Sequence, residues 1–117
     1  MVSLSVNNTS IPVLWEENDS VEELFSMLEN GAITIHTERY GGFEQVGSLP
    51  QSITSDDRQM TTATGDIVLY NGNSIVLFYG SNSWAYTKLG RIDGMSAEEI
   101  KKLLDVGEME ITISPAE

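Results

Sequence analysis

Residues 36–45 bring together side chains that could hold an extended peptide. This segment, HTERYGGFEQ, contains Arg39, Phe43 and Gln45 beside two glycines. A guanidinium group can donate several hydrogen bonds to a peptide carbonyl, and an aromatic ring supplies an apolar wall. The alternative interpretation is an ordinary strand end and turn, with Arg39 paired to Glu38 or Glu44 on the surface and Phe43 packed into the core. Both interpretations stay open on the residues alone.

The other reactive residue types exclude several classes of site. The sequence has no cysteine and a single histidine, His36, which excludes a thiolate nucleophile, a zinc ribbon and a His-rich metal site. Neither a Walker loop nor a dinucleotide fingerprint is present, and no serine has a nucleophile-elbow context. Asp56, Asp57 and Asp66 could hold a hard cation only if folding brought them together. We expect no metal and no cofactor, and we expect His36 to face solvent because its neighbour Ile35 takes the buried face of a strand.

The net charge narrows the class of partner. With 18 acidic and 6 basic residues, the chain carries a formal charge of −12. It lacks the positive field that would attract a nucleic acid or an anionic membrane, so we expect neither as a partner. High negative charge favours solubility, and the absence of cysteine fits a reducing compartment. The first residues also lack the basic and apolar regions of a signal peptide, so we expect a cytoplasmic protein.

Short strands dominate the elements that must position these side chains. The 117 residues predict a single domain over residues 1–117. Alternating or β-branched runs predict strands within residues 2–6, 11–15, 32–40, 65–80, 84–92 and 108–114. The first two runs suggest an N-terminal hairpin, and the polar residues 50–64 form the longest predicted loop. Because no βαβ spacing repeats, the pattern predicts a mostly antiparallel β-barrel.

Two helices are predicted to cover the ends or faces of that barrel, within residues 17–31 and 95–104. Each combines an apolar face of helical periodicity with start signals. The start signals have the spacing of capping boxes: Ser20 with Glu23, Asp19 with Glu22, and Ser96 with Glu99.

The clearest local signal is Asn71-Gly72, which lies between two apolar runs in residues 65–80. This pair favours a type I′ hairpin turn. Both runs are apolar on both faces. One face must therefore cover the core, and the other must be covered by another element, such as a helix.

Several short motifs occur in a distinctive order along the predicted strands. They are Leu49-Pro50, Gly65-Asp66, Tyr70, Leu77-Phe78-Tyr79 and Leu89-Gly90-Arg91. On these motifs the sequence resembles the small bacterial and archaeal cyclophilin-like proteins from its first strand to its last. The resemblance implies a compact cyclophilin-like antiparallel β-barrel with two short α-helices.

The resemblance also implies an activity. Cyclophilins are peptidyl-prolyl cis/trans isomerases, which hold the proline ring in an apolar pocket while an arginine hydrogen-bonds the prolyl carbonyl. Arg39, Phe43 and Gln45 follow the order of the cyclophilin arginine, phenylalanine and glutamine, with each interval one residue shorter. Along a strand, a shift of one residue moves a side chain to the opposite face, whereas a turn that contains Gly41-Gly42 can restore the original geometry.

The second half of the chain resembles the cyclophilin pocket in part. Phe78-Tyr79 matches a strand of paired aromatics, and Trp84 matches a loop tryptophan. The loop after that tryptophan is shorter than in cyclophilins, and no residue matches their pocket histidine. The structural alternative for Trp84 is that its ring seals the end of the barrel.

Our leading hypothesis is a barrel-side cleft that binds an extended proline-containing peptide or a small ligand, with at most weak isomerase activity. The resemblance makes Arg39 and Gln45 the candidate catalytic residues. The candidate ligand-binding residues are Phe43, Phe78, Tyr79 and Trp84.

The alternative hypothesis is a non-catalytic, acidic protein-interaction module with a vestigial cleft. Its docking surface would be a group of clustered acids: Glu16, Glu17, Asp19, Glu22 and Glu23. Such a surface would attract a basic partner protein and release it as salt rises. A third hypothesis is an enzyme that uses the barrel for a small metabolite.

Overall fold

The computed structural model describes residues 2–115, so the ends of the predicted domain, residues 1 and 116–117, lie outside the described range. The described elements are ten strands and two helices: β1 (Ser3–Val6), β2 (Thr9–Ile11), β3 (Val13–Trp15), α1 (Asp19–Ser26), β4 (Ile33–Tyr40), β5 (Glu44–Ser48), β6 (Arg58–Thr61), β7 (Asp66–Tyr70), β8 (Ser74–Phe78), β9 (Ser83–Ile92), α2 (Ala97–Leu104) and β10 (Glu108–Ser114). Both helices in residues 2–115 fall short of the length and apolar character that a bilayer crossing requires.

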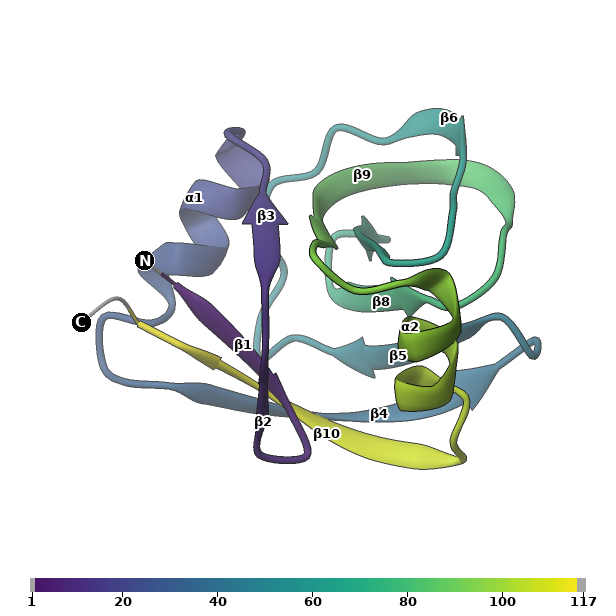
Figure 1. Ribbon diagram of the computed structural model, residues 1–117. Helices are drawn as coiled ribbons and strands as arrows, with labels where there is room; N and C mark the ends of the chain where they lie inside the picture. The colour runs from purple at the N-terminus through teal and green to yellow at the C-terminus, as the bar shows by residue number, and fades with distance from the viewer. Residues whose placement is uncertain (1, 116–117) are drawn as a thin grey trace.

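The strands form a nearly closed antiparallel barrel. Nine of them follow one another in the order β2-β1-β10-β4-β5-β8-β7-β9-β3, and β6 pairs with β9 outside this path. The two strands at the ends of this path, β2 and β3, are separated in the chain by Pro12 alone. Figure 1 shows β2 continuing directly into β3 beside the curled sheet. The predicted antiparallel barrel with two short helices is therefore confirmed.

The main core fills the barrel interior. It contains inward-facing residues of most strands, and each helix adds its apolar face, with Leu24 from α1 and Leu104 from α2 fully buried. Helix α2 lies in front of the curled strands, and α1 packs beside β3 (Figure 1). Burying these apolar side chains supplies most of the driving force for folding.

A second apolar cluster lies on the outer face of β7, β8 and β9. Its buried members are Val68, Val76, Phe78 and Tyr86, and its partly buried members are Phe43, Val46, Met60 and Tyr70. The sequence predicted that both faces of the 65–80 hairpin would be covered, and suggested a helix as the cover. In the described chain the cover consists instead of aromatic and apolar side chains from β5, β6, β9 and the turn before β5.

Two local signals are confirmed. Asn71 and Gly72 both have positive φ, 54° and 74°, as a type I′ turn requires. The side chain of Ser96 accepts a hydrogen bond from the backbone of Glu99, and the Glu99 carboxylate accepts one from the backbone of Ser96, which completes the predicted capping box.

Three local predictions are corrected. Pro12 splits the predicted return strand into β2 and β3 because it has no N–H for a ladder. The predicted loop over residues 50–64 contains a strand, β6, which pairs with β9. Helix α1 is capped by Asn18, whose side chain accepts from Val21 N at 2.9 Å, so neither Asp19 nor Ser20 is the cap.

Candidate functional site

An aromatic groove lies on the outer face of the barrel, where β4, β5, β7, β8 and β9 meet. Its volume is about 440 Å³. We define the aromatic groove by five rings and one carboxylate: Tyr40, Phe43, Glu44, Tyr70, Trp84 and Tyr86. A hollow of this size with mostly apolar walls is typical of a site for a small ligand or a short peptide segment.

Phe43 forms one wall of the groove and is fixed from two sides. Its ring stacks on that of Phe78, with centroids 6.3 Å apart and planes 4° apart. Its carbonyl accepts hydrogen bonds from Tyr79 N at 2.9 Å and from Gly80 N at 3.0 Å. A Cβ atom at Gly80 would lie 2.8 Å from the Cβ of Phe43, so the wall depends on a glycine at this position.

The other rings form a floor and a rim. Phe78 is fully buried beneath the groove, and Tyr86 meets it edge to face at 5.6 Å. The Tyr86 hydroxyl accepts a hydrogen bond from Asn82 Nδ2 at 2.7 Å. Tyr40 and Trp84, 67% and 56% exposed, form the rim, where a ligand would cover them.

Glu44 places a carboxylate in this aromatic surrounding. In the strand register it stands directly opposite Tyr40 on β4 and Phe78 on β8. The residue is only 7% exposed. Among the described residues, none donates a hydrogen bond to its carboxylate or forms an ion pair with it. Burial raises the pKa of Glu44 from its normal 4.5 to about 7, because the charged form loses hydration.

The sequence interpretation missed Glu44, which it treated only as a surface partner for arginine. A signal was present, since Glu44 and Val46 alternate with Gln45 along one strand and must share a face. Which of the two faces would carry the groove could not be read from that alternation, because both faces of β5 are largely buried.

The structure separates the six predicted site residues into two groups. Phe43 and Trp84 line the groove, with Phe78 beneath them. Arg39, Gln45 and Tyr79 lie on the opposite face of the sheet. Arg39 stands directly across from Gln45, whereas the next pair, Tyr40 and Glu44, faces the groove. Strand alternation therefore keeps Arg39 and Gln45 away from the aromatic rings that the sequence grouped with them.

Gln45 is held as part of the core rather than beside a ligand. Its amide Nε2 donates to Leu104 O at 2.9 Å and to Val106 O at 2.6 Å, just after the end of α2. Its Oε1 accepts a hydrogen bond from the Thr37 hydroxyl at 2.9 Å. The side chain is completely buried and ties β4 and β5 to the segment that leaves α2.

Arg39 and Tyr79 share this inner face near Asp105. The Arg39 guanidinium forms an ion pair of 3.2 Å with Asp105, and its side chain is 49% exposed. The Tyr79 hydroxyl is buried and makes no hydrogen bond of normal geometry within residues 2–115. Burial raises its pKa, and the nearby Asp105 carboxylate adds to that effect while Arg39 opposes it. This group faces α2 and does not reach the aromatic groove.

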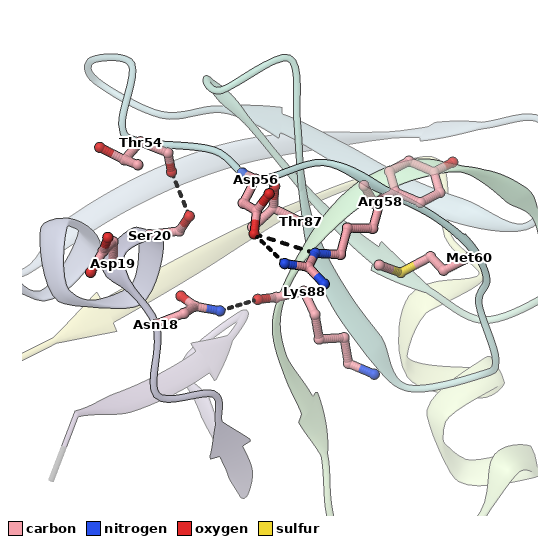
Figure 2. Close-up of a pocket in the computed structure, with 10 residues that line it drawn as sticks. Asn18, Asp19, Ser20, Thr54, Asp56, Arg58, Met60, Thr87 and Lys88 are labelled. Carbon is pink, nitrogen blue, oxygen red and sulfur yellow. Dashed lines mark hydrogen bonds and ion pairs between the residues drawn. The ribbon is translucent and has the colours of Figure 1, made fainter.

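A second hollow, of about 420 Å³, lies between the start of α1 and strands β6 and β9. Figure 2 shows the hydrogen bonds and the ion pair that three of its polar side chains, Asn18, Ser20 and Arg58, make with neighbouring residues. Arg58 bridges to Asp56 at 2.9 Å, and Asn18 Nδ2 donates to Lys88 O at 2.9 Å. The Ser20 hydroxyl donates to the carbonyl of Thr54. Arg58 pairs with Asp56 and Lys88 pairs with Asp66, so both positively charged groups that line this hollow already have partners.

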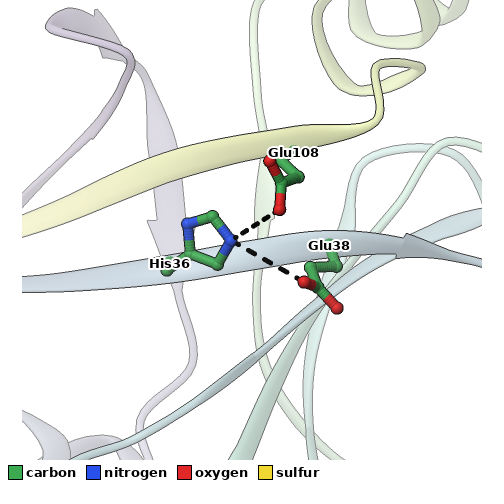
Figure 3. Close-up of side chains that lie close together, drawn as sticks. All are labelled: His36, Glu38 and Glu108. Atoms are coloured by element: carbon green, nitrogen blue, oxygen red, sulfur yellow. Dashed lines mark ion pairs between the residues drawn. The ribbon is translucent and has the colours of Figure 1, made fainter.

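One group of metal-ligand residue types comes together on the outer surface. His36 Nε2 lies 3.3 Å from Glu108 and 3.9 Å from Glu38, as Figure 3 shows. All three side chains are exposed, and their ligand atoms lie within 4.8 Å of one another. His36 faces solvent as predicted. Glu108 was not predicted to lie here, because it reaches this place through the β4–β10 pairing.

The three aspartates that could hold a cation only if folding brought them together have other partners. Asp56 pairs with Arg58, and Asp66 pairs with Lys88 at 2.9 Å. Asp57 accepts a hydrogen bond from the Thr87 hydroxyl at 2.6 Å.

Comparisons with known proteins connect this geometry to a family. The sequence model of the cyclophilin-like family matches residues 4–114, a range that includes every residue of the aromatic groove. A comparison with curated proteins found no match.

Proposed function

This chain belongs to the cyclophilin-like family, and from that premise we propose that it binds an extended proline-containing peptide or a small ligand in the aromatic groove. The observation that carries the proposal is the ring of five aromatic side chains around a hollow of about 440 Å³. Two of these rings, Tyr40 and Trp84, are more than half exposed and would be covered by a ligand. A proline ring packs well on such surfaces because it is apolar and rigid.

We propose at most weak isomerase activity for this groove. Rotation about an X-Pro bond has a barrier of roughly 20 kcal/mol, which an apolar surrounding can lower by desolvating the prolyl amide. In cyclophilins an arginine adds a hydrogen bond to the prolyl carbonyl. Here Arg39 lies on the other face of β4, paired with Asp105, so the groove lacks that donor.

Nuclear magnetic resonance with a short prolyl peptide tests the proposal. We expect the peptide to shift backbone resonances of the groove strands, and we expect Trp84→Ala to weaken binding about tenfold because it removes a rim ring. Leu14→Ala is the matched control, since Leu14 is a large apolar residue, 48% exposed, that does not line the groove. Equal loss in both variants, or shifts confined to other surfaces, would refute the proposal. Exchange spectroscopy on the same sample measures isomerisation.

The charge of −12 favours a second candidate, an acidic interaction module. The clustered acids near α1 include Glu16, Glu17 and Glu22, which are exposed. Binding of a basic partner at that surface would weaken steeply as salt rises. It would also be unaffected by Trp84→Ala, which separates it from groove binding.

A further inference from the structure

Glu44 is a largely buried carboxylate that forms no ion pair with any residue in the range 2–115. It is 7% exposed, and its strand neighbours across the sheet are the aromatic residues Tyr40 and Phe78. The guanidinium of Arg39 forms its ion pair with Asp105 on the opposite face of the sheet and not with Glu44. A buried carboxylate normally has a partner, because losing hydration without one is costly. In the empty groove the negative charge of Glu44 therefore has no positive partner among the described residues.

The rings around Glu44 are suited to complete that charge with an organic cation. Aromatic faces attract cations through their negative quadrupole, and tryptophan and tyrosine do so better than phenylalanine. Three tyrosines and one tryptophan line the groove: Tyr40, Tyr70, Tyr86 and Trp84. An inorganic divalent cation would find one carboxylate where Mg²⁺ or Ca²⁺ needs several oxygen ligands. The chemistry of the walls thus selects a cation with an apolar stem.

Lysine and arginine side chains have this form. Their methylene stems pack along apolar surfaces, while the charged head can reach a buried acceptor. The charge of −12 on the chain would also attract a basic segment and repel an acidic one. A peptide supplies such a side chain together with a backbone that the exposed rim of Tyr40 and Trp84 can cover.

Resting on the proposed function of the groove, we infer that the peptide it binds presents a lysine or arginine, whose charged head pairs with Glu44 between the aromatic rings. The selectivity of the site would then lie in the basic residue of the peptide. Glu44 acts as the counter-ion and the rim rings hold the stem. The inference adds a class of ligand that the proline-binding proposal does not contain.

A titration with two capped tripeptides tests this inference. One has the sequence glycine-lysine-glycine, and the other replaces lysine by norleucine, which has an uncharged chain of similar length. We expect the lysine peptide to bind about tenfold more tightly, at about pH 8, because only it forms the charged hydrogen bond. Glu44→Gln should abolish this preference. The same tripeptide with arginine should bind like the lysine peptide.

Glu38→Gln is the matched control variant. It removes the same unit of negative charge from the neighbouring strand, but the Glu38 side chain is 70% exposed. We expect it to change the affinity for the lysine peptide by less than about twofold, as is usual for an exposed charge. If both variants weakened binding equally, the attraction would be general to the acidic surface, and the inference would fall.

The outcomes also separate this inference from the proposed function. If norleucine and lysine peptides bind equally well in the groove, the charged pairing is refuted while groove binding of peptides stands. If neither tripeptide nor the prolyl peptide shifts groove resonances, both proposals fail. If the lysine peptide shifts only resonances near α1, the acidic surface and not the groove is its site.

A measurement on the unmodified protein keeps the test valid should Glu44→Gln fold poorly. Protonating Glu44 should weaken binding of the lysine peptide at about pH 5.5 relative to about pH 8. The titratable groups that face it in the groove are Tyr40 on β4, Tyr70 on β7 and Tyr86 on β9, and burial raises the pKa of Tyr86 further above its normal value. His36 on the same face of β4 is four positions from Tyr40, so the titration is followed at the carboxyl carbon of Glu44 itself. Peptide binding that left this resonance unchanged would overturn the pairing.

Discussion

The rings of Phe43 and Phe78 stack with planes 4° apart, although one residue belongs to a turn and the other to the middle of the sheet. Phe78 is fully buried in the second apolar cluster, and Phe43 is only partly covered. The stack therefore joins a wall of the aromatic groove to the packed outer face of the barrel. Changes at Phe43 should act on stability and on binding together.

We predict that Phe43→Leu lowers the free energy of unfolding by about 1–2 kcal/mol, through lost burial and lost ring stacking. It should also weaken binding of the prolyl peptide. Urea unfolding and a peptide titration measure the two effects. Phe25→Leu is the control, because Phe25 packs edge to face on Trp15 at 5.5 Å, away from the groove. It should cost similar stability and leave binding unchanged.

We predict that Glu44→Gln stabilises the free protein above neutral pH. The pKa of Glu44 is raised from 4.5 to about 7 in the folded state, so the fold favours its protonated form. The stabilisation that the raised pKa of Glu44 gives to the folded state is complete below pH 4.5 and is lost as pH rises through about 7. Glu44→Gln has no carboxylate to ionise, so its free energy of unfolding should exceed that of the wild type by roughly 1–3 kcal/mol at about pH 8.

Urea unfolding at a series of pH values measures this difference. The gap between variant and wild type should open between pH 4.5 and about 7 and stay constant above. Glu38→Gln should show no such gap, since that side chain is exposed. A pH-independent difference would contradict the buried, unpaired state of the Glu44 carboxylate.

We predict that Arg39→Ala leaves peptide binding in the groove unchanged. The guanidinium lies on the opposite face and pairs with Asp105 at 3.2 Å. Because this pair is half exposed, its loss should cost less than about 1 kcal/mol in unfolding free energy. The titration used for Trp84→Ala measures binding. If Arg39→Ala lost isomerase activity and kept its stability, Arg39 would have to contact the substrate, and the prediction would be wrong.

We predict that Gln45→Leu destabilises the protein by about 2–4 kcal/mol, because it leaves buried groups unpaired. The carbonyls of Leu104 and Val106 and the hydroxyl of Thr37 would each lose a partner. Thermal and urea unfolding measure the effect. A catalytic role for Gln45 would show the reverse pattern, with activity lost and stability retained.

Much of the fold was readable from local patterns. Strict alternation predicted β1, β4 and β10, and Asn71-Gly72 fixed one hairpin through its positive φ angles. Strand β6 escaped prediction because three of its four residues are polar and exposed, and Met60 alone is too little to mark an apolar period. Their pairing with β9 depends on tertiary contact, which local sequence does not encode.

The site was only half readable, for a geometric reason. Family resemblance identified Phe43 and Trp84, which do line the groove. It also grouped Arg39 and Gln45 with them, although these two residues stand opposite each other on the inner face of β4 and β5. Glu44, in contrast, lines the groove but was not predicted there, since an acidic residue beside a turn suggests an exposed surface. Only the packing of β4 and β8 on either side of it creates its burial.

Pro12 links the two outermost strands of the sheet, so the barrel is fastened by the covalent chain at the place where its hydrogen-bond ladder ends. A single proteolytic nick there would leave β2 attached only through its ladder with β1, and β3 only through its ladder with β9. Each ladder joins only three pairs of residues, so the ends of β2 and β3 next to the nick would be able to fray, and frayed edge strands are sites where other chains can pair.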